Sequence, residues 1–214
     1  MRKGLFRPGW LLLWLGLLTA CAQLNPSQSN VLFQDQFRPT QLTNWLLEGD
    51  ASGRSLIMNE QLVIQIDVPH TIQYVTLIEP TFSDFVLDVD AQLLSGPEES
   101  SYGVMFRQDE DGRFYRYQIT GTGYFVLERH DGTGNWTRLS DGWSQSEAIF
   151  QGANRVNRLR VEAVGSRLTV YANGELLHET SDDRLAAGTI ALDAGTFGQA
   201  GVQVAFDNVI VRQP

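Results

Sequence analysis

Short apolar runs, many of them alternating with polar residues, recur from Val31 to the end of the chain. None of them keeps a convincing helical period over a full helix length, and glycine, aspartate, asparagine and serine separate them at short intervals. Because side chains of a strand point alternately to opposite faces, this pattern predicts about fifteen short, half-buried strands. The body of the chain is therefore expected to be β throughout.

Two tight turns fix part of the expected topology. Gly165-Ser166 and Asn173-Gly174 each separate two apolar runs, and such pairs are typical of two-residue hairpins, in which glycine and asparagine tolerate positive φ. Many short strands joined by tight turns predict an all-β fold, a two-sheet antiparallel jelly-roll sandwich, over residues 31–214.

Alternation also assigns faces to the strands between residues 102 and 139. The side chains expected to face the core are those of Tyr102, Val104, Phe106, Tyr115, Tyr117, Ile119, Phe125, Leu127 and Leu139. The opposite sides collect aromatic, arginine and amide side chains that are unusual for a plain solvent face. The residues expected to form a ligand-binding surface there are Arg107, Arg116, Gln118, Tyr124, Glu128 and Trp136. The alternative is a solvated convex face, and one β-bulge would invert the assignment for its strand.

The composition excludes several classes of protein. The chain has 214 residues, 43% of them apolar, which is normal for a globular protein and argues against disorder. A single cysteine excludes a disulfide framework and a cysteine-based zinc site, and the three histidines show no metal-ligand spacing. The net charge of −9 argues against nucleic acid as a partner.

The first 20 residues have the features of a secretory signal peptide. A basic start without acidic residues is followed by the apolar run Trp10–Leu18 and by Leu18-Thr19-Ala20-Cys21. The apolar run is about half the length that a membrane-spanning helix needs. Cys21 resembles the lipidated cysteine of bacterial lipoproteins, which is diacylated and becomes the first residue of the mature chain. The alternative is an ordinary signal cut near Ala22, with Cys21 discarded.

Residues 21–30 are expected to join the lipid to the folded domain. This stretch is polar and contains a proline, as a short tether would. Two acyl chains provide a stable membrane anchor. Ala22 follows the cysteine where an aspartate is associated with inner-membrane retention, so the resemblance implies an extracytoplasmic protein, in the outer membrane if the cell has one.

Several segments together resemble a known family. They are Phe33-Gln34-Asp35-Gln36-Phe37, Tyr102-Gly103-Val104-Met105-Phe106-Arg107, Phe114-Tyr115-Arg116-Tyr117-Gln118-Ile119, Leu168-Thr169-Val170-Tyr171-Ala172-Asn173-Gly174 and Phe206-Asp207-Asn208-Val209. The chain looks like the concanavalin A-like lectin/glucanase superfamily, in the laminin-G-like branch that includes 3-keto-disaccharide hydrolase-type domains. The resemblance implies two antiparallel sheets, one of them concave, with carbohydrate binding common and hydrolysis in some branches.

The catalytic pattern of the superfamily's glucanases is not found in the sequence. Those enzymes carry Glu-x-Asp-x-x-Glu on one strand, whereas Asp88-Val89-Asp90 here lacks both glutamates. No catalytic residue is therefore assigned, and an enzyme is the less favoured reading. No cofactor is expected apart from a possible structural Ca²⁺, held by Asp35 and Asp207 if the terminal strands pair.

The sequence thus predicts a lipid-anchored, extracytoplasmic domain that binds a ligand without catalysis. Carbohydrate is the leading ligand class, because aromatic faces stack on sugar rings while arginine and amide groups bond hydroxyls. Two alternatives stay open. One is a glycoside-active enzyme of the 3-keto-disaccharide hydrolase type, and the other is a protein–protein interaction module, which a large exposed apolar patch would favour.

Overall fold

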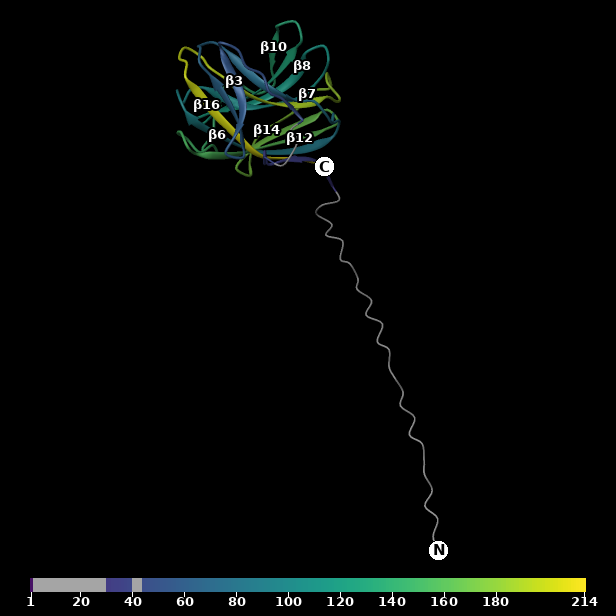
Figure 1. The fold of residues 1–214 in the computed structure, drawn as a ribbon. Coiled ribbons are helices and arrows are strands. Elements are labelled where there is room, and N and C mark those ends of the chain that lie inside the picture. The colour runs from purple at the N-terminus through teal and green to yellow at the C-terminus, as the bar shows by residue number, and fades with distance from the viewer. Residues whose placement is uncertain (2–29, 40–43) are drawn as a thin grey trace.

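A computed structural model describes residues 1, 30–39 and 44–214, which form two antiparallel eight-stranded sheets packed face to face (Figure 1). All the regular secondary structure in this part of the chain is β-strand. The described residues contain no helix that could cross a membrane. The all-β sandwich expected from the sequence is confirmed. Cys21, the signal peptide and most of the tether lie outside the described residues.

The two sheets are named here sheet I and sheet II. Sheet I contains, in spatial order, β14 (Glu175–Ser181), β13 (Arg167–Ala172), β12 (Val156–Val164), β6 (Phe85–Ser95), β16 (Val202–Arg212), β4 (Gln61–Ile66) and β3 (Gly53–Met58), with β1 (Val31–Asp35) beside β16. Sheet II contains β10 (Trp136–Arg138), β9 (Tyr124–Asp131), β8 (Arg113–Thr120), β7 (Ser101–Gln108), β15 (Thr189–Gly195), β5 (Ile72–Leu77) and β2 (Trp45–Leu46), with β11 (Ser144–Gln145) beside β9.

The inward faces of the two sheets share one hydrophobic core. Eight of the nine side chains expected to point inward between residues 102 and 139 are buried in it, and Leu139 packs against it partly exposed. Burying a large apolar side chain contributes about 1.5–3 kcal/mol, so a core of this size supplies the main stabilisation of the sandwich. The alternation in the sequence therefore identified the core face of sheet II correctly.

The tight turns also form as expected. β12 and β13 are joined at Gly165, and β13 and β14 at Asn173 and Gly174, which both have positive φ. Positive φ at both central positions is the requirement of the hairpin turn that suits twisted strands. The two-residue strand β11 was not predicted, because two residues carry no periodicity.

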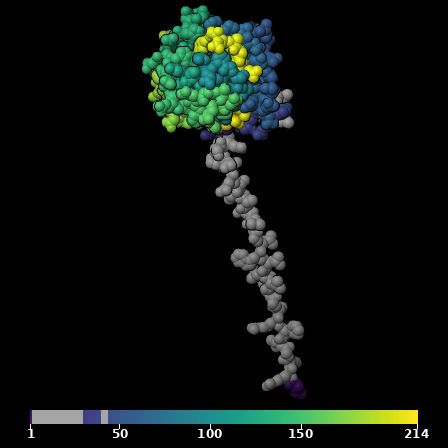
Figure 2. Space-filling view, turned by 90° about the vertical axis from the view of Figure 1, so that its left-hand side faces the viewer, coloured from purple at the N-terminus to yellow at the C-terminus, as the bar shows by residue number. Residues whose placement is uncertain are grey.

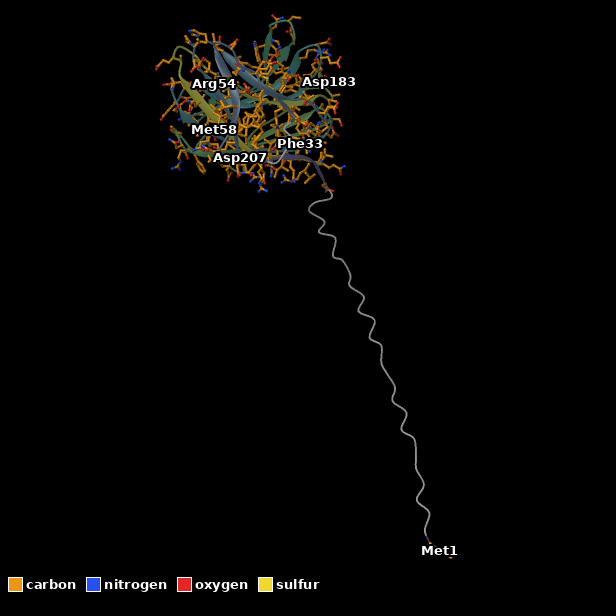
Figure 3. The ribbon with its side chains drawn as sticks, in the orientation of Figure 1. Met1, Phe33, Arg54, Met58, Asp183 and Asp207 are labelled. Atoms are coloured by element: carbon orange, nitrogen blue, oxygen red, sulfur yellow. The ribbon has the colours of Figure 1, made fainter. Side chains whose placement is uncertain are left out.

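Segments far apart in the sequence lie side by side in sheet I. One half of β16 pairs with β4 and the other half with β1, so the C-terminal residues (yellow in Figure 2) lie between earlier parts of the chain. Phe33 of β1 and Asp207 of β16 are labelled in Figure 3. The backbone N–H of Gln213 donates to the carbonyl of Asn30, which places the start of the described body beside the C-terminus. In Figure 1 this end of the body is at the bottom and β10 is at the top.

The outer face of sheet I buries one carboxylate under arginines. Asp88 is covered by Arg160, Arg212 and Arg158, whose nitrogens lie 2.9, 2.7 and 3.5 Å from its oxygens. Burial by itself would raise the pKa of Asp88, but its hydrogen bond to Arg160 and the charges of Arg160 and Arg158 bring the pKa below its ordinary value. The face that carries Arg158, Arg160 and Glu162 is thus charged, and it holds a structural carboxylate.

Arg107 is fully buried, so its predicted place on an exposed surface is wrong. The pairing of β7 with β15 shifts register opposite this residue, and Arg107 has a φ of +50°. It is the extra residue of a β-bulge, which turns its side chain away from the face that alternation assigns. Its guanidinium donates to the carbonyl oxygens of Ser83, Gly165 and Leu185 at 2.8–3.0 Å.

Arg107 should therefore matter for folding. Arg107→Ala leaves three carbonyls without their donor and is expected to lower the free energy of unfolding by about 3 kcal/mol, measured by urea denaturation. Arg138→Ala is the control, because the Arg138 side chain is 69% exposed and its removal should change stability little. Equal denaturation midpoints for the two variants would contradict the structural role of Arg107.

Candidate functional site

The strand register brings polar residues of four strands into one row on the outer face of sheet II. Asp193 of β15 lies directly opposite Tyr74 of β5 on one side and Gly103 of β7 on the other. Gly103 in turn lies opposite Gln118 of β8. Residues directly opposite each other in antiparallel strands share a face, so these side chains lie on the side of the sheet away from the core.

Gly103 allows side chains of two non-adjacent strands to meet. The amide nitrogen of Gln118 donates to a carboxylate oxygen of Asp193 at 2.6 Å, across the intervening strand β7. A β-carbon on Gly103 would lie 2.0 Å from the carbonyl oxygen of Tyr117, so no other residue fits there without a shift of the backbone. A glycine inside a strand often marks such a close approach.

Asp193 is a fully buried carboxylate beneath this face. Burial raises its pKa, while the charge of Arg116 and the hydrogen bond from Gln118 act in the opposite direction. The Nε atom of Arg116 lies 3.0 Å from the same oxygen that Gln118 binds. The other oxygen, Oδ1, has no hydrogen-bond partner among the described residues. Asp193 therefore holds both Arg116 and Gln118 in fixed orientations.

A cleft of about 920 Å³ opens above these residues. Its floor includes Arg116, Gln118 and Ser101, and its walls come from β10 and from loops at the ends of β4, β10 and β15. The residues that line it are His70, Ile72, Ser101, Arg116, Gln118, Glu128, Trp136, Thr137, Arg138, Trp143, Gly195, Thr196 and Phe197. Figure 1 shows β10, which forms one wall, at the top of the body.

Aromatic rings flank the polar floor of the cleft on two sides. Trp136 is exposed and its ring centroid lies 5.1 Å from the guanidinium carbon of Arg116, a cation–π contact. His130 and Phe114 support Trp136 from behind, with ring centroids at 4.8 and 5.6 Å.

On another side, Trp143 meets Phe197 edge to face at 6.2 Å. These two residues come from different loops, so the contact joins the loop after β10 to the loop after β15. The cleft therefore combines flat apolar surfaces with hydrogen-bonding groups between them.

Two further side chains add titratable groups to the cleft. The carboxylate of Glu128 is partly exposed and lies 4.0 Å from the guanidinium of Arg138. His70 is exposed and has a φ of +53°, an uncommon backbone conformation held by a hydrogen bond from its N–H to the carbonyl of Phe197. Both side chains could bond a ligand.

The cleft contains four of the six residues that alternation assigned to a ligand-binding surface. Arg116, Gln118, Glu128 and Trp136 line it, whereas Arg107 is in the core and Tyr124 is exposed outside the cleft. Arg116 and Gln118 form a buried floor and are not freely exposed as expected. Their role in ligand binding stays a prediction.

Sequence reasoning missed several loop residues of the cleft. His70, Thr196 and Phe197 lie outside alternating strands, so no period could place them. Trp143 lies on the cleft wall and is half-buried. A tryptophan in a glycine-rich and serine-rich stretch was the only signal in the sequence.

The terminal strands pair, as the cation hypothesis for Asp35 and Asp207 required, since Asp35 lies opposite Val209. The carboxylate of Asp35 already accepts hydrogen bonds from the backbone N–H of Phe37 at 2.7 Å and from the indole of Trp45 at 3.1 Å. Among the described residues no group of three potential ligands could hold a metal ion. The structure thus gives Asp35 a structural role, and Ca²⁺ binding stays a hypothesis.

Solved structures with the same fold include sugar-binding and sugar-cleaving proteins. The carbohydrate-binding module CBM66 from Bacillus subtilis is 18% identical, with a TM-score of 0.65, and the match covers 81% of this chain and 98% of that one. The laminarinase catalytic domain from Thermotoga maritima MSB8 is 13% identical, with a TM-score of 0.62, covering 86% and 98%. At these identities the likeness establishes the fold alone. No curated protein sequence matches the chain.

The comparison with protein families covers nearly the whole described body. Residues 31–212 match the model of one family, and this range contains all sixteen described strands. The match agrees with the concanavalin A-like jelly roll seen in the structure. The chain belongs to the family of 3-keto-alpha-glucoside-1,2-lyase-like domains.

Proposed function

We propose that the cleft of sheet II binds carbohydrate and does not cleave it. The observation that carries this proposal is the position of Arg116 and Gln118, held by Asp193 on the floor between aromatic walls. Sugar rings expose flat C–H surfaces and hydroxyl edges. The indole faces of Trp136 and Trp143 can stack on the C–H surfaces. The guanidinium of Arg116 and the amide of Gln118 can form hydrogen bonds with the hydroxyls.

The carboxylates of the site favour binding over hydrolysis. Glycoside hydrolysis by the common mechanisms requires two carboxyl groups that face each other across the scissile bond. Among the described residues that line the cleft, Glu128 is the one acidic side chain, and Asp193 is enclosed beneath Arg116 and Gln118. One accessible carboxylate does not provide the acid and the base that such a reaction needs.

We further propose that lipidated Cys21 anchors the domain outside the cytoplasmic membrane. The leader Trp10–Leu18 and Leu18-Thr19-Ala20-Cys21 support this localisation. The described body begins next to its C-terminus, at the end opposite β10 in Figure 1. A chain anchored ahead of residue 30 would therefore present the β10 wall of the cleft away from the membrane.

A glycan-array screen tests the binding proposal. A soluble chain that begins at Ala22 contains every described strand and should bind one class of saccharide. Trp136→Ala should weaken this binding about tenfold or more, because aromatic anchors dominate such interfaces. Its melting temperature should stay nearly unchanged, because Trp136 is exposed.

Tyr124→Ala is the matched control, since it removes an exposed aromatic ring of sheet II outside the cleft. Its binding should equal that of the wild-type protein. Arg116→Ala is a poorer test of binding, because it leaves buried Asp193 without its cation, and breaking a buried pair costs about 3–5 kcal/mol of stability. Wild-type affinity in Trp136→Ala would place the site elsewhere.

A second candidate function is suggested by the family, whose name describes a 1,2-lyase. In such an elimination a base removes the proton from C2, beside the 3-keto group. The aglycone leaves C1 with the electron pair of the C1–O bond and takes up a proton, which the protonated base can return. Glu128 is the carboxylate positioned to act as this base. One base is enough for elimination, unlike glycoside hydrolysis.

Turnover of a 3-keto-α-glucoside separates the two candidates. We expect the soluble chain to release no aglycone, measured by chromatography after prolonged incubation. Release that Glu128→Gln reduces by about 100-fold or more, the usual contribution of a general base, would instead establish the lyase.

The anchoring proposal has its own test. Cys21→Ser should abolish labelling by an alkyne-tagged fatty acid and shift the protein from the membrane fraction to the soluble fraction, because the thiol that carries the lipid is removed. The substitution lies outside the described body and should leave saccharide binding intact. Membrane retention of an unlabelled Cys21→Ser protein would refute lipid anchoring.

A further inference from the structure

The outer face of sheet II continues past the cleft with exposed apolar side chains on β5 and β2. Ile72 lines the cleft and is 44% exposed. Tyr74, two residues further along β5, is also 44% exposed and points to the same side. Leu46 of β2, which pairs with Thr76, is 49% exposed. The side of the cleft formed by Ile72 therefore opens onto a platform made of Ile72, Tyr74 and Leu46.

Tyr74 stands in register with the floor of the cleft. It lies directly opposite Asp193, which in turn contacts Gln118 across Gly103. Its ring and hydroxyl make no hydrogen bond or aromatic contact with the described residues. By contrast, Trp136, Trp143 and Phe197, which line the cleft, each pack against another ring. An exposed tyrosine without a partner offers both a stacking face and a hydroxyl to a ligand.

We propose that Tyr74 is a second stacking position and that the ligand is a saccharide chain rather than a single terminal sugar. This inference rests on the proposed function of the cleft. Five strand spacings separate β10, which carries Trp136, from β5, which carries Tyr74. At about 4.8 Å per spacing the two strands lie about 24 Å apart, several times the width of a sugar ring.

The side chains between the two aromatic positions are better suited to bind a chain of sugars than to bind the apolar surface of another protein. Arg116 and Gln118 of β8 line the cleft between β10 and β5, so polar groups separate Trp136 from Tyr74. A repeat of ring and polar group matches the repeat of sugar faces and hydroxyls along a chain. Neither Ile72 nor Leu46 is covered by another described segment, since both are among the exposed large hydrophobic residues.

Ladders of soluble oligosaccharides test the inference. The probes are β-1,3-linked, β-1,4-linked and α-1,4-linked gluco-oligosaccharides, each from the disaccharide to the octasaccharide, titrated calorimetrically into the chain that begins at Ala22. Affinity should rise with chain length until the chain reaches Tyr74. Tyr74→Ala should lower the affinity for the octasaccharide about tenfold and leave the affinity for the disaccharide unchanged.

Two variants serve as controls. Tyr74→Phe keeps the ring and should retain most of the affinity for the octasaccharide. Phe150→Ala removes a side chain of matched exposure, 45%, that lies outside both the cleft and the platform, and should have no effect at any chain length. Unchanged melting temperatures would confirm that all variants fold.

The outcomes separate this inference from the proposed function. If a ladder binds in a Trp136-dependent manner, but affinity is independent of length and Tyr74→Ala has no effect, the cleft binds sugar and the inference is wrong. An equal loss at every length in Tyr74→Ala would also overturn it, since Tyr74 would then belong to the first subsite. If no ladder binds the wild-type chain, both the proposed function for these glucans and the inference fail.

Discussion

The buried carboxylate of Asp193 constrains the outer face of sheet II. A charge without water costs several kcal/mol unless opposite charge and hydrogen bonds offset the loss. Arg116 and Gln118 supply both, from a strand that is not adjacent to β15. Their side chains must therefore cross β7, where Gly103, which has no side chain, stands in register between Asp193 and Gln118. The polar floor of the cleft is fixed before any ligand arrives.

This arrangement also determines the net charge of the cleft floor that a ligand would contact. The positive charge of Arg116 is balanced by Asp193, and that of Arg138 faces Glu128. The floor thus offers directed N–H groups without a large net field, in a chain whose formal charge is −9. Such a surface favours uncharged, hydroxyl-rich ligands over polyanions, because an acidic chain repels a polyanion. The charge balance supports the proposal that the ligand is a neutral sugar.

Alternation in the sequence predicted most of the sandwich, because apolar residues must recur at every second position in a strand that is buried on one face. It placed Tyr115 and Tyr117 in the core and Arg116 and Gln118 on the opposite face correctly. It failed at Arg107, where a bulge breaks the period. It could not find His70 or Phe197, because loop positions depend on contacts between segments distant in sequence. The sequence could not predict the hydrogen bond between Gln118 and Asp193 for the same reason.

Both sheets bury an aspartate on their outer face, but the surroundings of the two carboxylates differ. On sheet I both oxygens of Asp88 accept hydrogen bonds, from Arg160 and Arg212, and Arg158 adds a third positive charge at 3.5 Å. On sheet II Asp193 binds Arg116 and Gln118 through one oxygen, and its other oxygen has no hydrogen-bond partner among the described residues. The β10 strand and the loop that carries Trp143 form walls beside Arg116 and Gln118, and the outer face of sheet II thereby forms the cleft. A buried carboxylate thus anchors arginines on the outer face of sheet I and orients the polar floor of the cleft on sheet II.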